Sequence, residues 1–220
     1  MSIEIINLSK KFKDIFAVNN ISFEINPNKT VGLLGPNGCG KTTSIGMMLG
    51  LIKPSNGKIL IKKKNINTLD RNKLLSIMNF ASPYVELPKK LSVKQNLQIY
   101  GRLYGVEDLS ERISELVEDL NLKDFLNKQT GELSSGQKNR VSLAKSLINR
   151  PEILLLDEPT ASLDPDTGDY VRSYVQSYKA KNKVTILLAS HNMAEVERLC
   201  DSVIMIKKGK IIDQGTSKEI

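Results

Sequence analysis

The sequence has little of what would place it in several classes of protein. It contains no tryptophan, one histidine and two cysteines, Cys39 and Cys200, which do not form a Cys-x-x-Cys pair. This pattern excludes a disulfide scaffold and a zinc knuckle and is typical of a reducing cytosol. No apolar run approaches the roughly 18 residues of a membrane-spanning helix, and the N-terminus lacks the apolar segment of a signal peptide. If the protein acts at a membrane, we expect another chain to bring it there.

Acidic residues are in the minority, since 24 Asp and Glu face 32 Lys and Arg and give a formal net charge of +8. A basic excess is typical of proteins that bind nucleic acid or an anionic membrane surface. The lysines are scattered, however, and no aromatic residues lie among them to stack on bases. We therefore interpret the charge as a solvated lysine-rich face and expect no nucleic-acid partner.

The pattern of apolar residues predicts an α/β fold in one domain of 220 residues. Short Ile-, Val- and Leu-rich runs alternate with helical stretches, which favours a parallel sheet covered by helices. The expected strands are residues 3–8, 21–25, 30–35, 57–66, 77–82, 152–158, 184–190 and 202–209. The expected helices are residues 41–52, 91–106, 109–122, 165–181 and 192–200, with another beginning at 135. Ser92 and Ser110 are the expected N-caps of two of them. The middle helices predict an insert at about residues 84–149 within a core of 1–83 and 150–220.

A glycine-rich loop is the strongest motif. Its residues match G-x-x-x-x-G-K-[ST] after an expected strand and before an expected helix: Gly35, Pro36, Asn37, Gly38, Cys39, Gly40, Lys41 and Thr42, with Thr43 following. The glycines let backbone N–H groups turn toward phosphate oxygens, Lys41 adds a positive charge, and the Thr42 hydroxyl is a ligand for Mg²⁺. The motif predicts a nucleotide site, and the alternative is a glycine-rich turn that binds nothing.

Two carboxylates close a second buried strand. The stretch Ile153–Pro159 reads "ILLLDEP", so Asp157 and Glu158 lie at the carboxyl edge of the expected sheet, where ligands collect. We expect Asp157 to hold Mg²⁺, through water, and Glu158 to polarise the attacking water. The alternative is an acidic turn after a strand.

A third stretch, "LSSGQ", opens the helix that begins at residue 135, and alone it would be an ordinary N-cap. Together with "GPNGCGKTT", "ILLLDEP", "SLD" at residues 162–164 and His191 after a strand, it resembles the nucleotide-binding domain of ABC ATPases. The order and rough spacing fit over essentially the whole chain. The resemblance implies a P-loop NTPase (RecA-like) core with a parallel sheet, an N-terminal antiparallel β part and a helical subdomain.

The resemblance also implies an arrangement of two subunits around two ATP molecules with Mg²⁺. The glycine-rich loop of one subunit would hold the phosphates, while Ser134, Ser135, Gly136 and Gln137 of a second ATP-binding subunit would cover the γ-phosphate. Closure on ATP binding and opening on hydrolysis would drive transmembrane permease subunits from the cytoplasmic face of the membrane. The stretch 91–106 resembles, more loosely, family members that serve export-type permeases.

Three single residues take roles from the resemblance. His191 would contact the γ-phosphate and orient the water, Asp164 would couple the two sites, and Phe12 would stack on adenine. Their alternatives are a structural histidine, the start of a helix and a core phenylalanine, and Asp164 can both start a helix and couple the sites.

One segment departs from the family pattern. The family usually has a glutamine after the strand expected at residues 77–82, and it touches Mg²⁺ and faces the transmembrane subunit. Here Ser82 takes that position, with Pro83 as the alternative alignment. A serine would reach the metal only through a water, so the alternative is a loop that serves only subunit docking.

Cys39 lies in the glycine-rich loop beside inward N–H groups and Lys41, an environment that favours thiolate. We therefore expect it to be alkylated readily and protected by ATP. The alternative is an inert buried thiol.

Three classes of function compete. The first is the ATPase subunit of an ABC transporter, and the second is a soluble ABC ATPase that acts on ribosomes or nucleic acid. The second usually needs two such domains or a long coiled coil, and the chain has neither. The third is another P-loop enzyme, such as a kinase or GTPase, but no guanine-reading Asn-Lys-x-Asp motif is present. The sequence favours the first.

Overall fold

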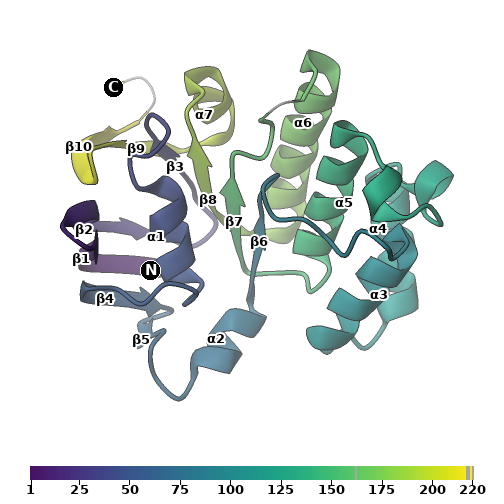
Figure 1. The fold of residues 1–220 in the computed structure, drawn as a ribbon, viewed down its shortest axis with the longest axis horizontal. Coiled ribbons are helices and arrows are strands. Elements are labelled where there is room, and N and C mark those ends of the chain that lie inside the picture. The colour runs from purple at the N-terminus through teal and green to yellow at the C-terminus, as the bar shows by residue number, and fades with distance from the viewer. Residues whose placement is uncertain (162, 217–218, 220) are drawn as a thin grey trace.

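The central element of the fold is a six-stranded sheet with the order β10-β9-β3-β8-β7-β6 (Figure 1). The structure is a computed structural model that describes residues 1–161, 163–216 and 219. The strands are β3 (Thr30–Leu34), β6 (Met78–Ala81), β7 (Ile153–Asp157), β8 (Thr185–Ser190), β9 (Ser202–Lys207) and β10 (Lys210–Gly215). All neighbours are parallel except β9 and β10. β3, β7 and β8 are buried throughout, because helices cover both faces.

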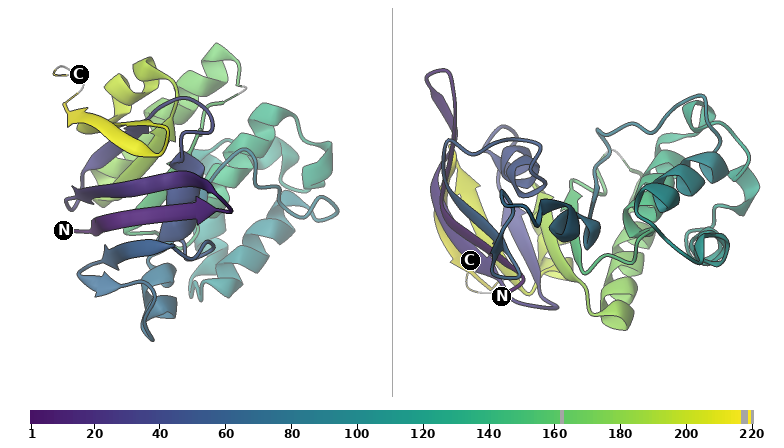
Figure 2. Two further views of the ribbon diagram at one scale, coloured as in Figure 1. Left: turned by 60° about the vertical axis from the view of Figure 1, so that its left-hand side comes forward. Right: turned by 90° about the horizontal axis from the view of Figure 1, so that it is seen from below.

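The N-terminal part forms a second, antiparallel sheet with the order β2-β1-β4-β5. Its strands are β1 (Ile3–Phe12), β2 (Ile15–Ile25), β4 (Asn56–Ile61) and β5 (Lys64–Asn65). Ile3, Ile25 and Ile61 are fully buried and share one core with the first helix and the central sheet. The expected antiparallel part is therefore confirmed, and Figure 2 places it at the opposite end of the molecule from the teal helices.

Seven α-helices lie within the described residues. They are α1 (Lys41–Met48), α2 (Arg71–Ser76), α3 (Val93–Leu103), α4 (Leu109–Asp119), α5 (Ser135–Leu147), α6 (Pro165–Asn182) and α7 (Met193–Leu199), with short 3-10 turns at Lys123–Phe125 and Thr130–Glu132. Helices α3, α4 and α5 gather at one end (Figure 1), and their apolar faces share a second core with β7, β8 and α6. None of the helices in the described part of the chain is long and apolar enough to cross a membrane.

Helix α5 is fixed to strand β6 by polar contacts. The Lys145 Nζ donates to the carbonyl oxygen of Phe80 at 2.7 Å, and Asn79 Nδ2 donates to the carbonyl oxygen of Lys145 at 3.3 Å. Lys145 is buried, and burial lowers its pKa to about 8. These contacts join the helix that begins with "SSGQ" to the strand that leads into Ser82.

Local structure departs from the sequence predictions in several places. The strand expected at 57–66 is interrupted at Lys62 and Lys63, whose φ of 48° and 66° form a left-handed turn between β4 and β5. The expected N-cap Ser92 is confirmed, and it forms a capping box with Gln95. The expected N-cap Ser110 is wrong, because α4 begins at Leu109 after Asp108. Strand β10 and helix α2 were not predicted, since both are short and mostly exposed.

Candidate active site

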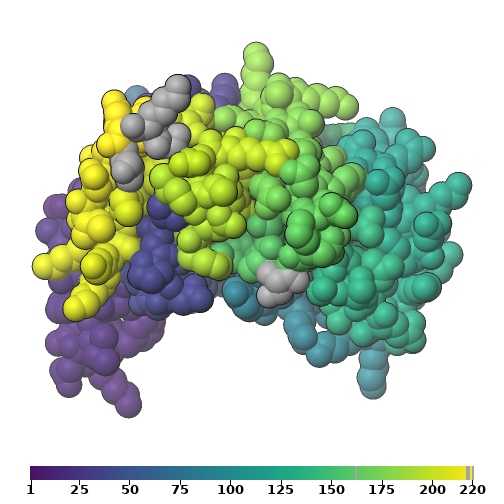
Figure 3. All heavy atoms as spheres, turned by 90° about the horizontal axis from the view of Figure 1, so that it is seen from above, coloured from purple at the N-terminus to yellow at the C-terminus, as the bar shows by residue number. Residues whose placement is uncertain are grey.

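The predicted catalytic residues meet at the carboxyl edge of the central sheet. The glycine-rich loop follows β3, Asp157 ends β7, and His191 follows β8. The register pairs Leu34 with Ser190 and Asp157 with Ala189, so their loops leave the sheet side by side. Figure 3 views the molecule from this side, with the purple β1–β2 hairpin at one end and the teal helices at the other. In open α/β sheets this edge is where ligands bind.

The glycine-rich loop leaves the start of α1 open. Gly40 is the N-cap with a left-handed φ of 113°, and no side chain caps the helix. A Cβ at Gly40 would lie 2.4 Å from the carbonyl oxygen of Ala17 in β2, so the position requires glycine. The first N–H groups of α1 are therefore free of side-chain caps, which is the arrangement that binds phosphate at a helix N-terminus.

Lys41, Glu158 and His191 form a connected polar group. The Lys41 Nζ donates to Gly35 O at 2.6 Å and lies 3.4 Å from Glu158 Oε1. The other Glu158 oxygen, Oε2, lies 2.6 Å from His191 Nδ1. Lys41 and Glu158 are buried, whereas the His191 side chain is half exposed. The structure thus brings all three predicted residues into contact.

The backbone of Glu158 is strained, which the sequence did not reveal. Its φ of 53° is left-handed, a conformation that a long side chain rarely adopts. The Glu158 N–H donates to Ala189 O at 2.8 Å, which ties the residue to β8. The strain turns the chain sharply directly after β7 and is of the kind found at functional sites.

Asp157 and Thr42 form an oxygen pair that fits Mg²⁺. The Thr42 hydroxyl donates to Asp157 Oδ2 at 2.8 Å, and Asp157 Oδ1 is buried without a hydrogen-bond partner. Burial raises the pKa of Asp157, and the bond from Thr42 opposes that rise. Among the described residues no three His, Cys, Asp or Glu cluster as a metal site. Mg²⁺ commonly takes only one or two protein oxygens and completes its shell with phosphate and water, so this pair fits it.

The "SSGQ" residues lie at the start of α5, apart from the glycine-rich loop. Ser134 is the N-cap, and its hydroxyl accepts from the Gln137 N–H while Gln137 Oε1 accepts from the Ser134 N–H. Ser134 and Ser135 are exposed, and a Cβ at Gly136 would lie 3.3 Å from Thr167 of α6. We predicted from the sequence that both helix starts bind phosphate. Within one chain they have different neighbours, because the start of α1 lies beside β2 and the start of α5 lies beside α6.

The remaining predicted residues lie around the same edge. Phe12 is half exposed at the end of β1 and has Lys10 Nζ 4.9 Å from its ring centroid, so it is not a core phenylalanine. Asp164 caps α6 by accepting from the Thr167 N–H, and this bond lowers its pKa. Ser162 of the same "SLD" motif lies outside the described residues. Ser82 is buried at the end of β6, where its hydroxyl accepts from the Tyr84 N–H at 3.3 Å.

Cys39 corrects one prediction. Its side chain is 3% exposed, and burial raises the pKa of the thiol more than Lys41 and the neighbouring N–H groups lower it. The expected thiolate is therefore wrong, and the inert buried thiol is the better description. The sequence showed the charges near Cys39 but not its burial, and a Cβ at Gly35 would lie 2.8 Å from its sulfur.

The sequence reasoning missed one buried acidic residue, Glu195. It lies in the first turn of α7, where acidic residues are common, so it resembled an ordinary helix start. In the structure it is 2% exposed and accepts hydrogen bonds from Thr160 and Ser190. Glu195 could be identified only from the tertiary structure, which brings the start of α7 to the edge of the sheet where Thr160 and Ser190 lie.

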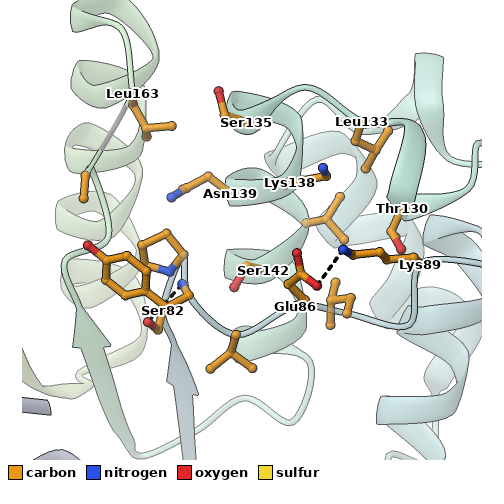
Figure 4. Close-up of a pocket in the computed structure, with 16 residues that line it drawn as sticks. Ser82, Glu86, Lys89, Thr130, Leu133, Ser135, Lys138, Asn139, Ser142 and Leu163 are labelled. Carbon is orange, nitrogen blue, oxygen red and sulfur yellow. Dashed lines mark hydrogen bonds and ion pairs between the residues drawn. The ribbon is translucent and has the colours of Figure 1, made fainter.

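A cavity of about 230 Å³ lies between the segment after β6 and helix α5. Figure 4 shows Asn139 and Ser142 of α5 facing the segment that begins with Ser82, and the Glu86–Lys89 ion pair at its rim. Most of its lining is apolar, including Tyr84, Val85 and Leu133. The segment that departs from the family pattern is therefore one wall of a cavity.

Comparison with known proteins assigns the family. A sequence profile described as ABC transporter matches residues 18–161, more than half of the chain's 220 residues. The ABC transporter ATP-binding protein NatA of Bacillus subtilis is 35% identical over 99% of this chain and 91% of its own. The Nod factor export ATP-binding protein I of Burkholderia lata is 36% identical over 95% of this chain and 69% of its own.

Among solved structures, the dimeric ATP-binding cassette MJ0796 bound to ADP and Pi superposes with a TM-score of 0.89. It is 25% identical, and the match covers 98% of each chain. The α/β fold, with a glycine-rich loop and polar side chains at this edge, defines the class as a P-loop NTPase. The chain belongs to the ABC transporter family, as an ATP-binding and ATP-hydrolysing transporter subunit. The kinase and GTPase interpretation is therefore wrong, and these relatives give no support to a role on ribosomes or nucleic acid.

Proposed function

We propose that two ATP-binding subunits pair head to tail, so that two chains complete each nucleotide site. The glycine-rich loop of one subunit holds the phosphates, and Ser134–Gln137 of the other covers the γ-phosphate. The observation that carries this proposal is the placement of the two helix starts, α1 beside β2 and α5 beside α6, in different parts of one chain. The dimeric state of MJ0796 supports it.

Within each site, we assign Lys41 to the outer phosphates and Thr42 and Asp157 to Mg²⁺, which would neutralise phosphate charge when bound. Ser82 reaches the metal only through a water. Phosphate draws the Lys41 ammonium away from Glu158, from which it is 3.4 Å distant. Glu158 is then free to accept a proton from the attacking water, and His191, 2.6 Å from Glu158, orients that water. Phe12 stacks on adenine, and Asp164 couples the two sites.

Outside the site, we propose that residues 84–149 act as a helical subdomain that moves against the core when the pair closes. The segment at Ser82–Leu87 and its cavity contact a transmembrane permease subunit. The subunit then works at the cytoplasmic face of a membrane, and the relative named for Nod factor export supports an export-type permease. The second subunit is another copy of the chain or a similar chain.

The test is the Glu158→Gln variant. We expect it to bind Mg-ATP, to dimerise and to hydrolyse ATP at least about 100-fold more slowly, because the base is lost while the shape is kept. Glu197→Gln is the matched control, since Glu197 is exposed on α7. Turnover at the wild-type rate would refute the assignment of the base.

The same variant tests the partner. Tagged Glu158→Gln is recovered from membranes in mild detergent with Mg-ATP, and its partners are identified by mass spectrometry. A stoichiometric multi-span membrane protein supports the permease. Ribosomal proteins or nucleic acid that survive a salt wash would contradict it.

A further inference from the structure

Glu195 connects the two loops that carry Glu158 and His191. Its Oε1 accepts from the Thr160 hydroxyl at 2.7 Å, and its Oε2 accepts from the Ser190 hydroxyl at 2.6 Å. Thr160 lies two residues after Glu158, and Ser190 directly precedes His191. One carboxylate therefore holds both segments, one oxygen to each.

The surroundings of Glu195 make this arrangement more than a surface contact. Glu195 is 2% exposed and Ser190 is fully buried. No ion pair to Glu195 occurs among the described residues, so the two hydroxyls are its side-chain partners. Burial of a carboxylate is costly unless such bonds compensate for lost water. A leucine in this place would leave the buried Ser190 hydroxyl and the Thr160 hydroxyl without this acceptor, so the two bonds are part of the local structure.

The Ser190 hydroxyl is both a hydrogen-bond acceptor and a hydrogen-bond donor. Its oxygen accepts from the Asn192 N–H at 3.1 Å, and its hydrogen is given to Glu195. The backbone on both sides of His191 is thus set by one hydroxyl. On the other loop, the Ala161 N–H donates to Glu158 O at 3.0 Å, and Thr160 lies inside that turn. A bond from Thr160 therefore helps to hold the strained left-handed backbone of Glu158.

We propose that Glu195 is a positioning residue for ATP hydrolysis: it sets the place of His191 relative to Glu158 through Ser190 and Thr160. The proposal rests on the proposed function of Glu158 and His191. Glu195 itself touches neither the nucleotide site's glycine-rich loop nor Thr42 in any hydrogen bond of the described residues. It acts through the 2.6 Å contact between Glu158 and His191.

The chain offers a direct readout, because His191 is its only histidine. A ¹H–¹³C spectrum of the imidazole contains one Hε1–Cε1 cross-peak, which reports the contact with Glu158. The variant Glu158→Gln gives the reference shift for a changed contact. We expect Glu195→Gln to move the cross-peak in the same direction, and the exposed control Glu197→Gln to leave it in place.

Kinetics supply the second readout. We expect Glu195→Gln to lower kcat about tenfold with the KM for ATP changed less than about twofold, because positioning and not binding is lost. Ser190→Ala and Thr160→Val each remove one of the two bonds and should give the same pattern, so the test does not depend on one variant folding. In a His191→Ala background, Ser190→Ala, whose bond acts on the loop of His191, should cause no further loss.

The proposal is overturned if the cross-peak of Glu195→Gln coincides with that of wild type, or if the kcat loss of Ser190→Ala persists unchanged in the His191→Ala background. A lowered melting temperature with wild-type kcat per folded molecule would also overturn it, because the role would then be structural only. Since the cross-peak needs no turnover, a shift seen while Glu158→Gln hydrolyses ATP normally would keep the positioning role and reject the proposed catalytic base.

Discussion

The two helix starts that the sequence marks as phosphate sites are built in opposite ways. At α1, Gly40 is a left-handed N-cap without a side-chain bond, so the backbone N–H groups are open. At α5, Ser134 and Gln137 close a reciprocal capping box. The first start is buried beside β2, and the second is exposed.

In the proposed dimer, this difference would give the two helix starts different ways of binding phosphate. The open start at α1 offers N–H groups that need an anion, which suits tight binding of the whole triphosphate. At α5 the Ser134 oxygen is used in the cap, and its hydroxyl hydrogen remains available to donate. Such a start adds one or two bonds to a phosphate brought by another molecule. We infer that the start of α1 provides most of the affinity for ATP, and that the start of α5 completes the nucleotide site of the partner subunit.

The largest effect is expected from a substitution at Gly40, the N-cap of α1. Gly40→Ala places a Cβ 2.4 Å from Ala17 O at a φ of 113°, whereas Gly136→Ala meets only Thr167 at 3.3 Å. We expect Gly40→Ala to lower ATP affinity at least about 100-fold and to destabilise the fold by about 3 kcal/mol. Gly136→Ala should keep the affinity of the isolated chain for ATP. Fluorescent-nucleotide titration and urea unfolding measure both, and equal affinities for the two variants would remove the distinction.

The next prediction separates the role of Ser134 as a helix N-cap from its proposed role at the partner's nucleotide. Ser134→Ala and Ser92→Ala each remove the serine of a capping box, at α5 and α3. Both should lower the free energy of unfolding by about 1 kcal/mol. Only Ser134→Ala should also lower ATP hydrolysis, by about tenfold or more, because in the proposed head-to-tail dimer its hydroxyl contacts the partner's nucleotide. Loss of hydrolysis in both variants would mean that the cap alone matters.

A smaller effect concerns the anchoring of α5. The pKa of Lys145 is lowered to about 8 from 10.5 by burial. Between those pH values the unfolded chain binds more protons than the folded one, so stability rises with pH there. The full penalty, on the order of 3 kcal/mol, applies below pH 8, where both states carry the proton. Lys145→Met should flatten this rise, and Lys138→Met, exposed on the same helix, should not. Chemical unfolding of the three proteins at pH values from about 7 to 10.5 measures this change in the free energy of unfolding.

The smallest effect is expected at Cys39. Because burial raises the pKa of its thiol, alkylation should be slow and nearly independent of ATP. Labelling with iodoacetamide in a Cys200→Ser background, followed by mass spectrometry, gives the rate. Rapid labelling that ATP suppresses would restore the thiolate that the sequence suggested.

The fold and much of the site were predictable because their signals are local. Alternating apolar runs gave the parallel sheet, and the order of motifs placed Lys41, Asp157, Glu158 and His191 at one edge, where the structure brings them into contact. The misses depend on tertiary structure. Burial reversed the expectation for Cys39, the bond from Glu195 reaches Thr160, 35 residues earlier in the chain, and the left-handed Glu158 has no sequence signature.

The most direct test of the split site mixes two defective subunits. Lys41→Ala disables the glycine-rich loop and Ser134→Ala disables the start of α5, so each alone is expected to hydrolyse little ATP. In a head-to-tail mixed dimer, one site takes Lys41 from one chain and Ser134 from the other and is intact. We predict recovery of about a quarter of wild-type activity on equal mixing, since about half of the dimers are mixed and each has one intact site. Lys41→Ala mixed with the Lys41→Ala/Ser134→Ala double variant has no intact site in any dimer and is the control. Mixed dimers that form, by cross-linking, but recover no activity would contradict the account.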